Sequence, residues 1–240
     1  MNRASAGLAL GVVVLALVGC GSDSKPTPPI FFTDPLPAGT VLNDSPANTM
    51  ARFAATLEYQ SRQSYAALLT DDFRFGFSAA TDPTLVAEYG NTWSARDDSI
   101  SAAHLFDGFT SSATGTFIPG ATTITLSLNV VSESGDSTHI DSLDVYRVIR
   151  VARLIGTIEV PTDPSGGAIY NLDSAQAFYL VRGDVAVLRP GQENRAERWY
   201  VRRWNDLSAP PSGYALNSRG GPTTNPTKPV TWGSIKNQYR

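Results

Sequence analysis

The sequence predicts an α+β domain in which helices come first and an antiparallel sheet follows. Helical periodicity and capping residues are concentrated between residues 45 and 106, whereas the segments after Gly108 are rich in Thr, Val, Leu and Ile. Short turns separate these later segments, and consecutive strands joined by short turns pair antiparallel. Because the two kinds of segment are separated along the chain, we expect helices that cover one face of a sheet.

The first predicted helix begins with a capping residue and a proline. Ser45 can accept a hydrogen bond as the N-cap, and Pro46 fits the first helical position. Apolar residues then recur at positions i, i+3, i+4 and i+7 within residues 50–57, so they share one helix face. A second short helix is expected at residues 63–69, followed by an Asp-containing turn at residues 70–72.

One strand and two more helices are predicted before Gly108. Between residues 73 and 77, phenylalanine alternates with Arg and Gly, which is the period of a strand with one buried face. Residues 82–90 begin with Asp-Pro and end in Gly, the pattern of a capped helix. The S-x-x-D pattern of residues 94–97 is typical of a capping box, and the helix behind it is expected to reach about Phe106.

Four β-rich segments complete the predicted domain. They cover residues 122–131, 143–160, 169–182 and 197–205. Turn residues gather at 134–136 and 164–167, where we expect hairpin loops. The long second segment is expected to bend near Gly156.

The first 20 residues carry the features of a bacterial export signal. Arg3 gives a short positive start, and residues 8–18 form an apolar run that is too short to span a bilayer. The run ends in Leu17-Val18-Gly19-Cys20, which resembles the lipobox of bacterial lipoproteins. The resemblance implies that residues 1–19 are a signal peptide and that Cys20 is the lipid attachment site. A secretory signal with an incidental cysteine is the alternative interpretation.

A lipid on Cys20 would hold the protein at a membrane without a transmembrane helix. Each buried methylene contributes about 0.8 kcal/mol, and two acyl chains already give stable anchoring. The resemblance therefore implies a lipid-anchored protein of the cell envelope, with the membrane as its first partner. Gly21 and Ser22 follow the cysteine, and by the sorting rule of this family they imply the outer membrane, facing the periplasm, if the source is Gram-negative.

Proline-rich flanks surround the predicted domain. Residues 20–46 contain the acyl-accepting cysteine and closely spaced prolines, which favour an extended tether. Residues 47–207 form the domain, and residues 208–240 form a Pro/Gly-rich arm with four basic residues and no acidic residue. Three roles stay open for this arm: an extended segment that folds back on the domain, a contact with the membrane surface, or a contact with a protein partner of the envelope.

Two segments resemble the NTF2-like, SnoaL-like family of cone folds. Residues 50–73 resemble its opening, in which a helix and a short second helix ending in Y-x-x-L-L-x-D-D lead into a strand. Residues 198–206 are similar to the W-x-I-x-x-W ending of bacterial members. Over about residues 47–207, the resemblance implies N-terminal helices packed on a curved antiparallel sheet. It implies no single activity, because the superfamily includes isomerases, dehydratases, hydrolase-like members and non-catalytic binding domains.

The residues at two positions of this sequence argue against the ketosteroid isomerase mechanism of the superfamily. Its ketosteroid isomerases use a tyrosine on the first helix and an aspartate on the first strand, and an alignment without a gap places these on Phe53 and Phe77. A phenyl ring can neither donate a hydrogen bond nor accept a proton. Phe53, Phe77, Trp93 and His104 are instead expected to line the cone cavity, which would then suit an apolar small-molecule ligand.

An enzymatic role would depend on His104, together with a carboxylate such as Asp107 or Asp72. The resemblance implies such a role, since dehydratase relatives use a histidine that faces the cavity. The structural alternative is a histidine at a helix end that interacts with terminal carbonyl groups, and we favour this alternative. The sequence therefore assigns no catalytic residue.

Charge and motifs argue against several other classes of function. The net charge of −3 argues against nucleic acid as a partner, although residues 195–204 combine arginine with tryptophan and tyrosine. The sequence has no zinc, EF-hand, P-loop or dinucleotide-binding motif, so we expect neither a metal nor a cofactor. His139 and Asp141, expected on one strand face, are interpreted as part of a solvated hairpin loop. A single cysteine excludes an intramolecular disulfide.

The sequence thus predicts a membrane-anchored envelope lipoprotein whose domain binds a small molecule or acts as a scaffold without catalysis. The alternative is a SnoaL-like enzyme of the isomerase, dehydratase or hydrolase type with a different set of catalytic residues. A third interpretation is that aromatic side chains fill the cone and that the outer surface carries the function.

Overall fold

The computed structural model describes residues 36–80, 83–162, 166–208 and 229–240. The chain divides into two compact units, Met1–Phe32 and Thr33–Arg240, and every described residue belongs to the second. The predicted signal peptide, Cys20 and the tether before residue 36 lie outside the described residues. Within the part that is described, no helix is long and apolar enough to cross a membrane.

The helices predicted near the N-terminus are present. The described α-helices are α1 (Pro46–Glu58), α2 (Arg62–Leu68), α3 (Pro83–Tyr89), α4 (Ala95–Asp107) and α5 (Trp232–Gln238). As predicted, Ser45 caps α1 by accepting a hydrogen bond from the Asn48 backbone N–H at 3.2 Å. Ser94 and Asp97 form a complete capping box at the start of α4, because each side chain accepts a hydrogen bond from the backbone N–H of the other.

The β-rich segments form one curved sheet with a small separate hairpin. The sheet has the order β2-β1-β8-β7-β6-β5, in which only the β1–β8 pair is parallel, and β9 adds to β7 in parallel. A second sheet pairs β3 with β4. The strands are β1 (Leu69–Gly76), β2 (Thr92–Ser94), β3 (Phe109–Thr110), β4 (Phe117–Ile118), β5 (Thr123–Gly135), β6 (Tyr146–Thr162), β7 (Gly166–Arg182), β8 (Trp199–Asp206) and β9 (Pro229–Val230).

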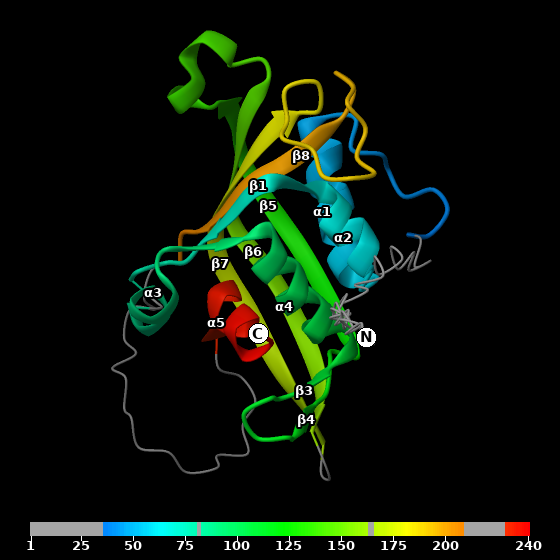
Figure 1. Cartoon of the computed structure of the whole chain (residues 1–240), viewed down its shortest axis with the longest axis vertical. Coiled ribbons are helices and arrows are strands. Elements are labelled where there is room, and N and C mark those ends of the chain that lie inside the picture. Colours follow the sequence, from blue (N-terminus) through cyan, green and yellow to red (C-terminus); the bar gives the residue numbers. More distant parts are fainter. Residues whose placement is uncertain (1–35, 81–82, 163–165, 209–228) are drawn as a thin grey trace, which may run out of the picture. The chain divides into compact units, whose positions relative to one another are not determined.

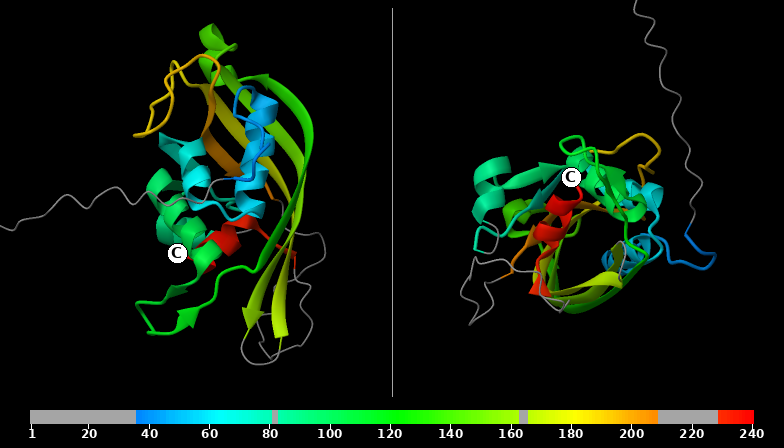
Figure 2. Two further views of the ribbon diagram at one scale, coloured as in Figure 1. Left: turned by 90° about the vertical axis from the view of Figure 1, so that its right-hand side faces the viewer. Right: turned by 90° about the horizontal axis from the view of Figure 1, so that it is seen from below.

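The long strands bend around the helices, as Figures 1 and 2 show. Register shifts interrupt the β5–β6 pairing near Val130 and the β6–β7 pairing after Val151, and such bulges bend a strand. Gly156 allows β6 to approach β5 closely, since a Cβ at this position would lie 2.4 Å from the Thr125 carbonyl oxygen. The predicted class is confirmed: the fold is α+β, with N-terminal helices packed on a curved and mainly antiparallel sheet.

Three local predictions are wrong. Residues 70–72, expected as a turn, belong to β1, so α2 leads directly into the strand. Residues 134–136 do not form the β5–β6 loop, because β5 continues to Gly135 and the 3-10 helix η1 (Ser137–Ser142) makes the connection. The end of the C-terminal arm is not extended: residues 229–240 form β9 and α5 and pack into the domain. The arm does fold back, but as a strand and a helix that bury Trp232, Ile235 and Tyr239.

Aromatic side chains from four elements meet at the centre of the core. Trp204 on β8 contacts Phe53 of α1, Phe75 of β1 and Phe178 of β7, with ring centroids 5.0–5.1 Å apart. All four side chains are fully buried. The Trp204 indole N–H donates to Gln176 Oε1 at 2.6 Å, so the polar atom of this large side chain is satisfied inside the core.

Candidate functional site

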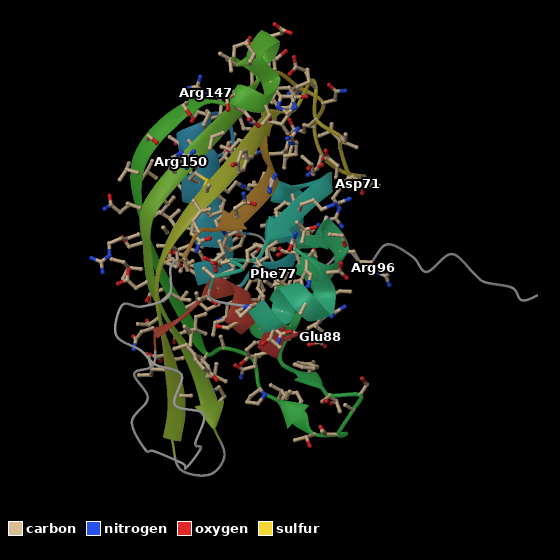
Figure 3. All side chains as sticks on the ribbon, turned by 90° about the vertical axis from the view of Figure 1, so that its left-hand side faces the viewer. Asp71, Phe77, Glu88, Arg96, Arg147 and Arg150 are labelled. Atoms are coloured by element: carbon tan, nitrogen blue, oxygen red, sulfur yellow. The ribbon has the colours of Figure 1, made fainter. Side chains whose placement is uncertain are left out.

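Three residues that were expected to line a cavity are buried in the hydrophobic core. Phe53 is fully buried, and Phe77 and Trp93 contact each other edge to face at a centroid distance of 4.9 Å. Phe77 lies inside the fold, whereas Asp71 and Arg96 lie at its surface (Figure 3). Their role as the lining of a ligand cavity stays a prediction.

His104 contacts the C-terminal helix. Its Nδ1 lies 2.9 Å from the Tyr239 carbonyl oxygen, and its ring stacks on Phe109 at a centroid distance of 4.3 Å. Because a carbonyl oxygen only accepts hydrogen bonds, Nδ1 must carry the proton in this contact. His104 therefore fixes the end of the chain against α4 and β3.

The two carboxylates proposed as partners of His104 are engaged elsewhere. Asp107 pairs with Arg62 at 2.7 Å, and the Asp72 carboxylate accepts a hydrogen bond from Thr70 Oγ1 at 2.6 Å. Within the described part of the chain, neither a hydrogen bond nor an ion pair joins these carboxylates to the histidine. The structure therefore gives no acid–base pair from this set.

A buried polar cluster lies where α2, α4 and α5 meet. It consists of Tyr65, Asp98 and Lys236, none of which is more than 2% exposed. The Lys236 ammonium pairs with Asp98 Oδ1, and the Tyr65 hydroxyl donates to Asp98 Oδ2 at 2.5 Å. Lys236 Nζ also lies 3.4 Å from the Tyr65 oxygen. Each carboxylate oxygen thus has its own donor.

Local structure places each member of this cluster. Asp98 lies one residue after the α4 capping box, on the same buried face as Ala102 and Leu105. Thr231 caps α5 by accepting a hydrogen bond from Ser234 N at 3.0 Å. Ser101 Oγ of α4 donates to the Lys236 carbonyl oxygen at 2.8 Å, which sets α5 beside α4 (Figure 1).

Two aromatic faces complete the surroundings of the ammonium group. Lys236 Nζ lies 4.1 Å from the centroid of the Phe75 ring and 4.2 Å from that of Trp204. Both distances are within the range of cation–π attraction, which is strongest when the cation is removed from water. The site therefore holds one cation between a carboxylate and two ring faces.

A second buried carboxylate supports the start of α5. Asp206, at the end of β8, accepts hydrogen bonds from Gln176 Nε2 at 3.2 Å, from the Ser208 N–H at 3.0 Å and from the Ser208 hydroxyl. Its other oxygen accepts from the Gly233 N–H at 3.4 Å. This network joins β7, β8 and α5 next to Trp204.

Burial shifts the ionisation of the cluster. It lowers the pKa of Lys236 to about 8, and the negative charge of Asp98 opposes this shift without cancelling it. Burial also raises the pKa of Tyr65 well above its usual range, and Asp98 adds to that shift. Tyr65 therefore remains a protonated hydrogen-bond donor at any physiological pH.

The lowered pKa of Lys236 predicts that the protein becomes more stable as pH rises from 8 to 9.5. In this window an unfolded lysine, with a pKa of about 10.4, holds its proton while the folded lysine loses it, so the free energy of unfolding increases with pH. We expect a gain of about 1–2 kcal/mol. Urea unfolding across this window measures it, with Lys236→Met as the control that lacks the gain; a wild-type stability that is flat or falls would contradict the prediction.

Sequence reasoning missed this cluster, although each helix carried a signal. The α4 spacing puts Asp98 in line with buried alanine and leucine positions, although acidic residues are also common as solvated charges in the first turn of a helix. In the same way, Lys236 belongs to the i, i+3, i+4, i+7 set of α5 that begins at Trp232 and ends at Tyr239. A charged residue inside an apolar stripe is the pattern that points to a buried pair.

The other histidine lies in a smaller cluster at the η1 end of the sheet. His139 lies in η1, which connects β5 to β6, so its interpretation as part of a hairpin loop is confirmed and its placement on a strand face is wrong. Arg202 Nη1 lies 3.0 Å from His139 Nε2, and the His139 ring stacks on Tyr146 at 3.9 Å. Asp136 is almost fully buried beside them, 3.4 Å from His139 Nδ1. These contacts anchor η1 to β8 and β6.

The surface also has a groove of about 390 Å³ near the far end of the β6–β7 hairpin. Its lining combines one carboxylate and one threonine with four apolar residues and includes none of the candidate site residues: Thr122, Glu159, Val160, Pro161, Ala168 and Ile169. Among the described residues, no group of three or more His, Cys, Asp or Glu side chains could hold a metal ion.

Comparisons with known proteins find similar structures but no similar sequences. No protein-family model matches the chain, and no curated protein matches it. A conserved protein from Planctomyces limnophilus is similar with a TM-score of 0.43 and 12% identity, over 66% of this chain and 89% of the other. An NTF2-like superfamily protein from Salmonella enterica serovar Typhimurium has a TM-score of 0.39 and 8% identity, over 72% and 92% of the two chains. An NTF2-like protein of unknown function in nutrient uptake from Rhodospirillum rubrum has a TM-score of 0.38 and 12% identity, over 69% and 98%.

Proposed function

We propose that the chain is a lipid-anchored protein of the bacterial cell envelope and that its α+β domain is a non-catalytic binding domain. Cys20 carries the lipid, and the domain is of the NTF2-like kind that the sequence motifs indicate. In a Gram-negative source it faces the periplasm from the outer membrane. A small-molecule ligand or an envelope protein is its partner.

One observation carries the non-catalytic part of this proposal. Among the described residues, Asp98 is the most deeply buried carboxylate and Lys236 the most deeply buried basic side chain, and the two neutralise each other inside an aromatic enclosure. His104, Asp107 and Asp72 are each engaged by structural partners, as described above. A catalytic acid or base needs access to a substrate proton. In these contacts each ionisable side chain is paired with another residue of the domain, which favours a structural role over proton transfer.

The enzymatic alternative predicts a different result for one variant. If the domain were a SnoaL-like enzyme that used His104, His104→Ala would abolish turnover of its substrate while the fold remained. Under the present proposal the same variant loses the hydrogen bond to Tyr239 and the stacking on Phe109, so its defect appears in stability. Paired measurements of turnover and of unfolding on this variant distinguish the two functions.

Lipid anchoring predicts that Cys20→Ser moves the protein out of the membrane fraction. Expressed from its full chain in a bacterial host, the wild type should sediment with membranes and be released by detergent but not by 1 M salt, since acyl chains and not charges hold it. The Cys20→Ser variant should not sediment. A Ser22→Ala variant, which keeps the acceptor cysteine, is the matched control and should stay in the membrane fraction. Equal sedimentation of the wild type and Cys20→Ser would contradict lipid attachment.

A further inference from the structure

The polar cluster is made of two separate parts of the chain. Asp98, Tyr65, Phe75 and Trp204 come from α4, α2, β1 and β8, which all lie between residues 62 and 206. The ammonium comes from Lys236 on α5, near the end of the chain. The main body thus supplies the carboxylate, the hydroxyl group and the two ring faces described around the cation, and α5 supplies the cation.

The groups from the main body are held in place by one another and not by Lys236 alone. Tyr65 donates to one oxygen of Asp98, and its ring packs near Phe53 at a centroid distance of 5.8 Å and near Phe106 at 6.4 Å. Trp204 is fixed by its hydrogen bond to Gln176. A carboxylate with one free oxygen, beside two ring faces, would therefore persist if the ammonium left.

This set of groups matches the chemistry that recognises organic ammonium ions. A carboxylate neutralises the positive charge, and aromatic faces within about 6 Å attract the cation and its attached methylene or methyl groups. Both rings here lie within 4.2 Å of the nitrogen. The Tyr65 oxygen, 3.4 Å away, offers a further acceptor for an N–H.

A helix that only had to cover the core would not need this lysine. Trp232, Ile235 and Tyr239 already give α5 three buried anchors, and an apolar residue at position 236 beside an apolar residue at position 98 would avoid the desolvation of two charges. Because of the ion pair, the docking of α5 instead depends on a cation that lies beside Asp98 in the interior.

We propose that the interior of the domain is a binding site for an organic ammonium ion and that the Lys236 side chain occupies this site when no ligand is bound. The inference rests on the proposed binding function and names its ligand class: a primary or N-methylated amine on a short apolar group. Such a ligand competes with Lys236 for Asp98, Phe75 and Trp204. Binding therefore releases α5 from the body, and the presence of α5 keeps the affinity of the wild type low.

Chemical rescue of Lys236→Ala in the full chain tests the site. n-Butylammonium carries the four carbons and the ammonium group of a complete lysine side chain, so we expect it to raise the melting temperature of this variant in a saturable way. n-Butanol and sodium chloride at equal concentrations should not do so. The double variant Lys236→Ala/Asp98→Asn, which removes the carboxylate charge, should lose the rescue. If Lys236→Ala does not fold alone, the same comparison is made by refolding it from urea with each compound present.

The wild type provides the second arm of the test. At n-butylammonium concentrations that saturate the rescue of the variant, capture of the open state should increase the hydrogen-exchange rates of residues 232–238 in the wild type, and the increase should grow with concentration. n-Butanol should leave these rates unchanged. Both effects together would support the proposal.

Three results would overturn it. The first is an absence of rescue, and the second is a rescue that n-butanol or the Asp98→Asn background reproduces. The third is a rescued variant combined with unchanged exchange in the wild type, which would make Lys236 a permanent structural residue. None of them bears on lipid attachment at Cys20, which the fractionation experiment tests separately.

Discussion

Lys236→Ala is expected to lower the free energy of unfolding by about 3–5 kcal/mol at pH 7. The substitution removes the ammonium and leaves the Asp98 carboxylate buried with only the Tyr65 hydroxyl as a donor. Breaking a buried ion pair by removing one partner costs this amount, because the remaining charge is neither solvated nor neutralised. Urea denaturation followed by circular dichroism measures the change, with the slope of the transition as a check that the same surface is exposed.

Two controls separate the unpaired charge from the loss of packing. Lys236→Met/Asp98→Asn removes both charges and keeps similar volumes, so it should recover most of the lost stability. Arg153→Ala breaks an ion pair with Asp173 whose members are both about half exposed, and its unfolding curve should lie close to that of the wild type. If the double variant were as unstable as Lys236→Ala, the explanation by an unpaired buried charge would be wrong.

Trp204→Ala is expected to cost about 4–5 kcal/mol of stability. Its indole ring is fully buried, touches Phe53, Phe75 and Phe178, and lies 4.2 Å from the Lys236 ammonium. Truncation of a buried tryptophan leaves a large cavity, and here it also leaves Gln176 Oε1 without its donor. The measurement is the same urea transition.

Trp204→Phe distinguishes the packing from the hydrogen bond. Phenylalanine retains most of the apolar surface but cannot donate to Gln176, so we expect a smaller loss of about 1–3 kcal/mol. Tyr59, which is 60% exposed, gives the surface control, and Tyr59→Ala should change stability by no more than about 0.5 kcal/mol. A Trp204→Ala variant as stable as Tyr59→Ala would contradict the packing described here.

The sequence predicted those helices and strands whose positions are set by residues within the segment itself. The capping residue Ser45 and the capping box of residues 94–97 fixed the starts of α1 and α4, and both are present as predicted. The four β-rich segments became β5–β8 for a similar reason, because their composition suits a half-buried pleated surface. Residues 70–72 belong to β1 although two aspartates favour a turn, and they lie at the irregularity of the β1–β8 pairing between Leu69 and Arg74.

The candidate site could not be predicted because its two halves are far apart in sequence. A helix of seven residues such as α5 is not stable in isolation, so its formation depends on the groove that receives it. Asp98 and Lys236 are separated by 138 residues, and no local pattern pairs them. Each lies within an apolar stripe, which predicts that it is buried but not which partner it meets.

Hydrogen exchange of the full wild-type chain tests the central claim most directly, namely that α5 fills the interior of the domain. If α5 is docked as described, the amides of residues 233–240 should exchange at least about a hundredfold more slowly than in an unstructured peptide. That factor corresponds to a docking free energy of about 2.7 kcal/mol. Exchange of these amides at the unstructured rate, with α4 and β8 still protected, would contradict the account.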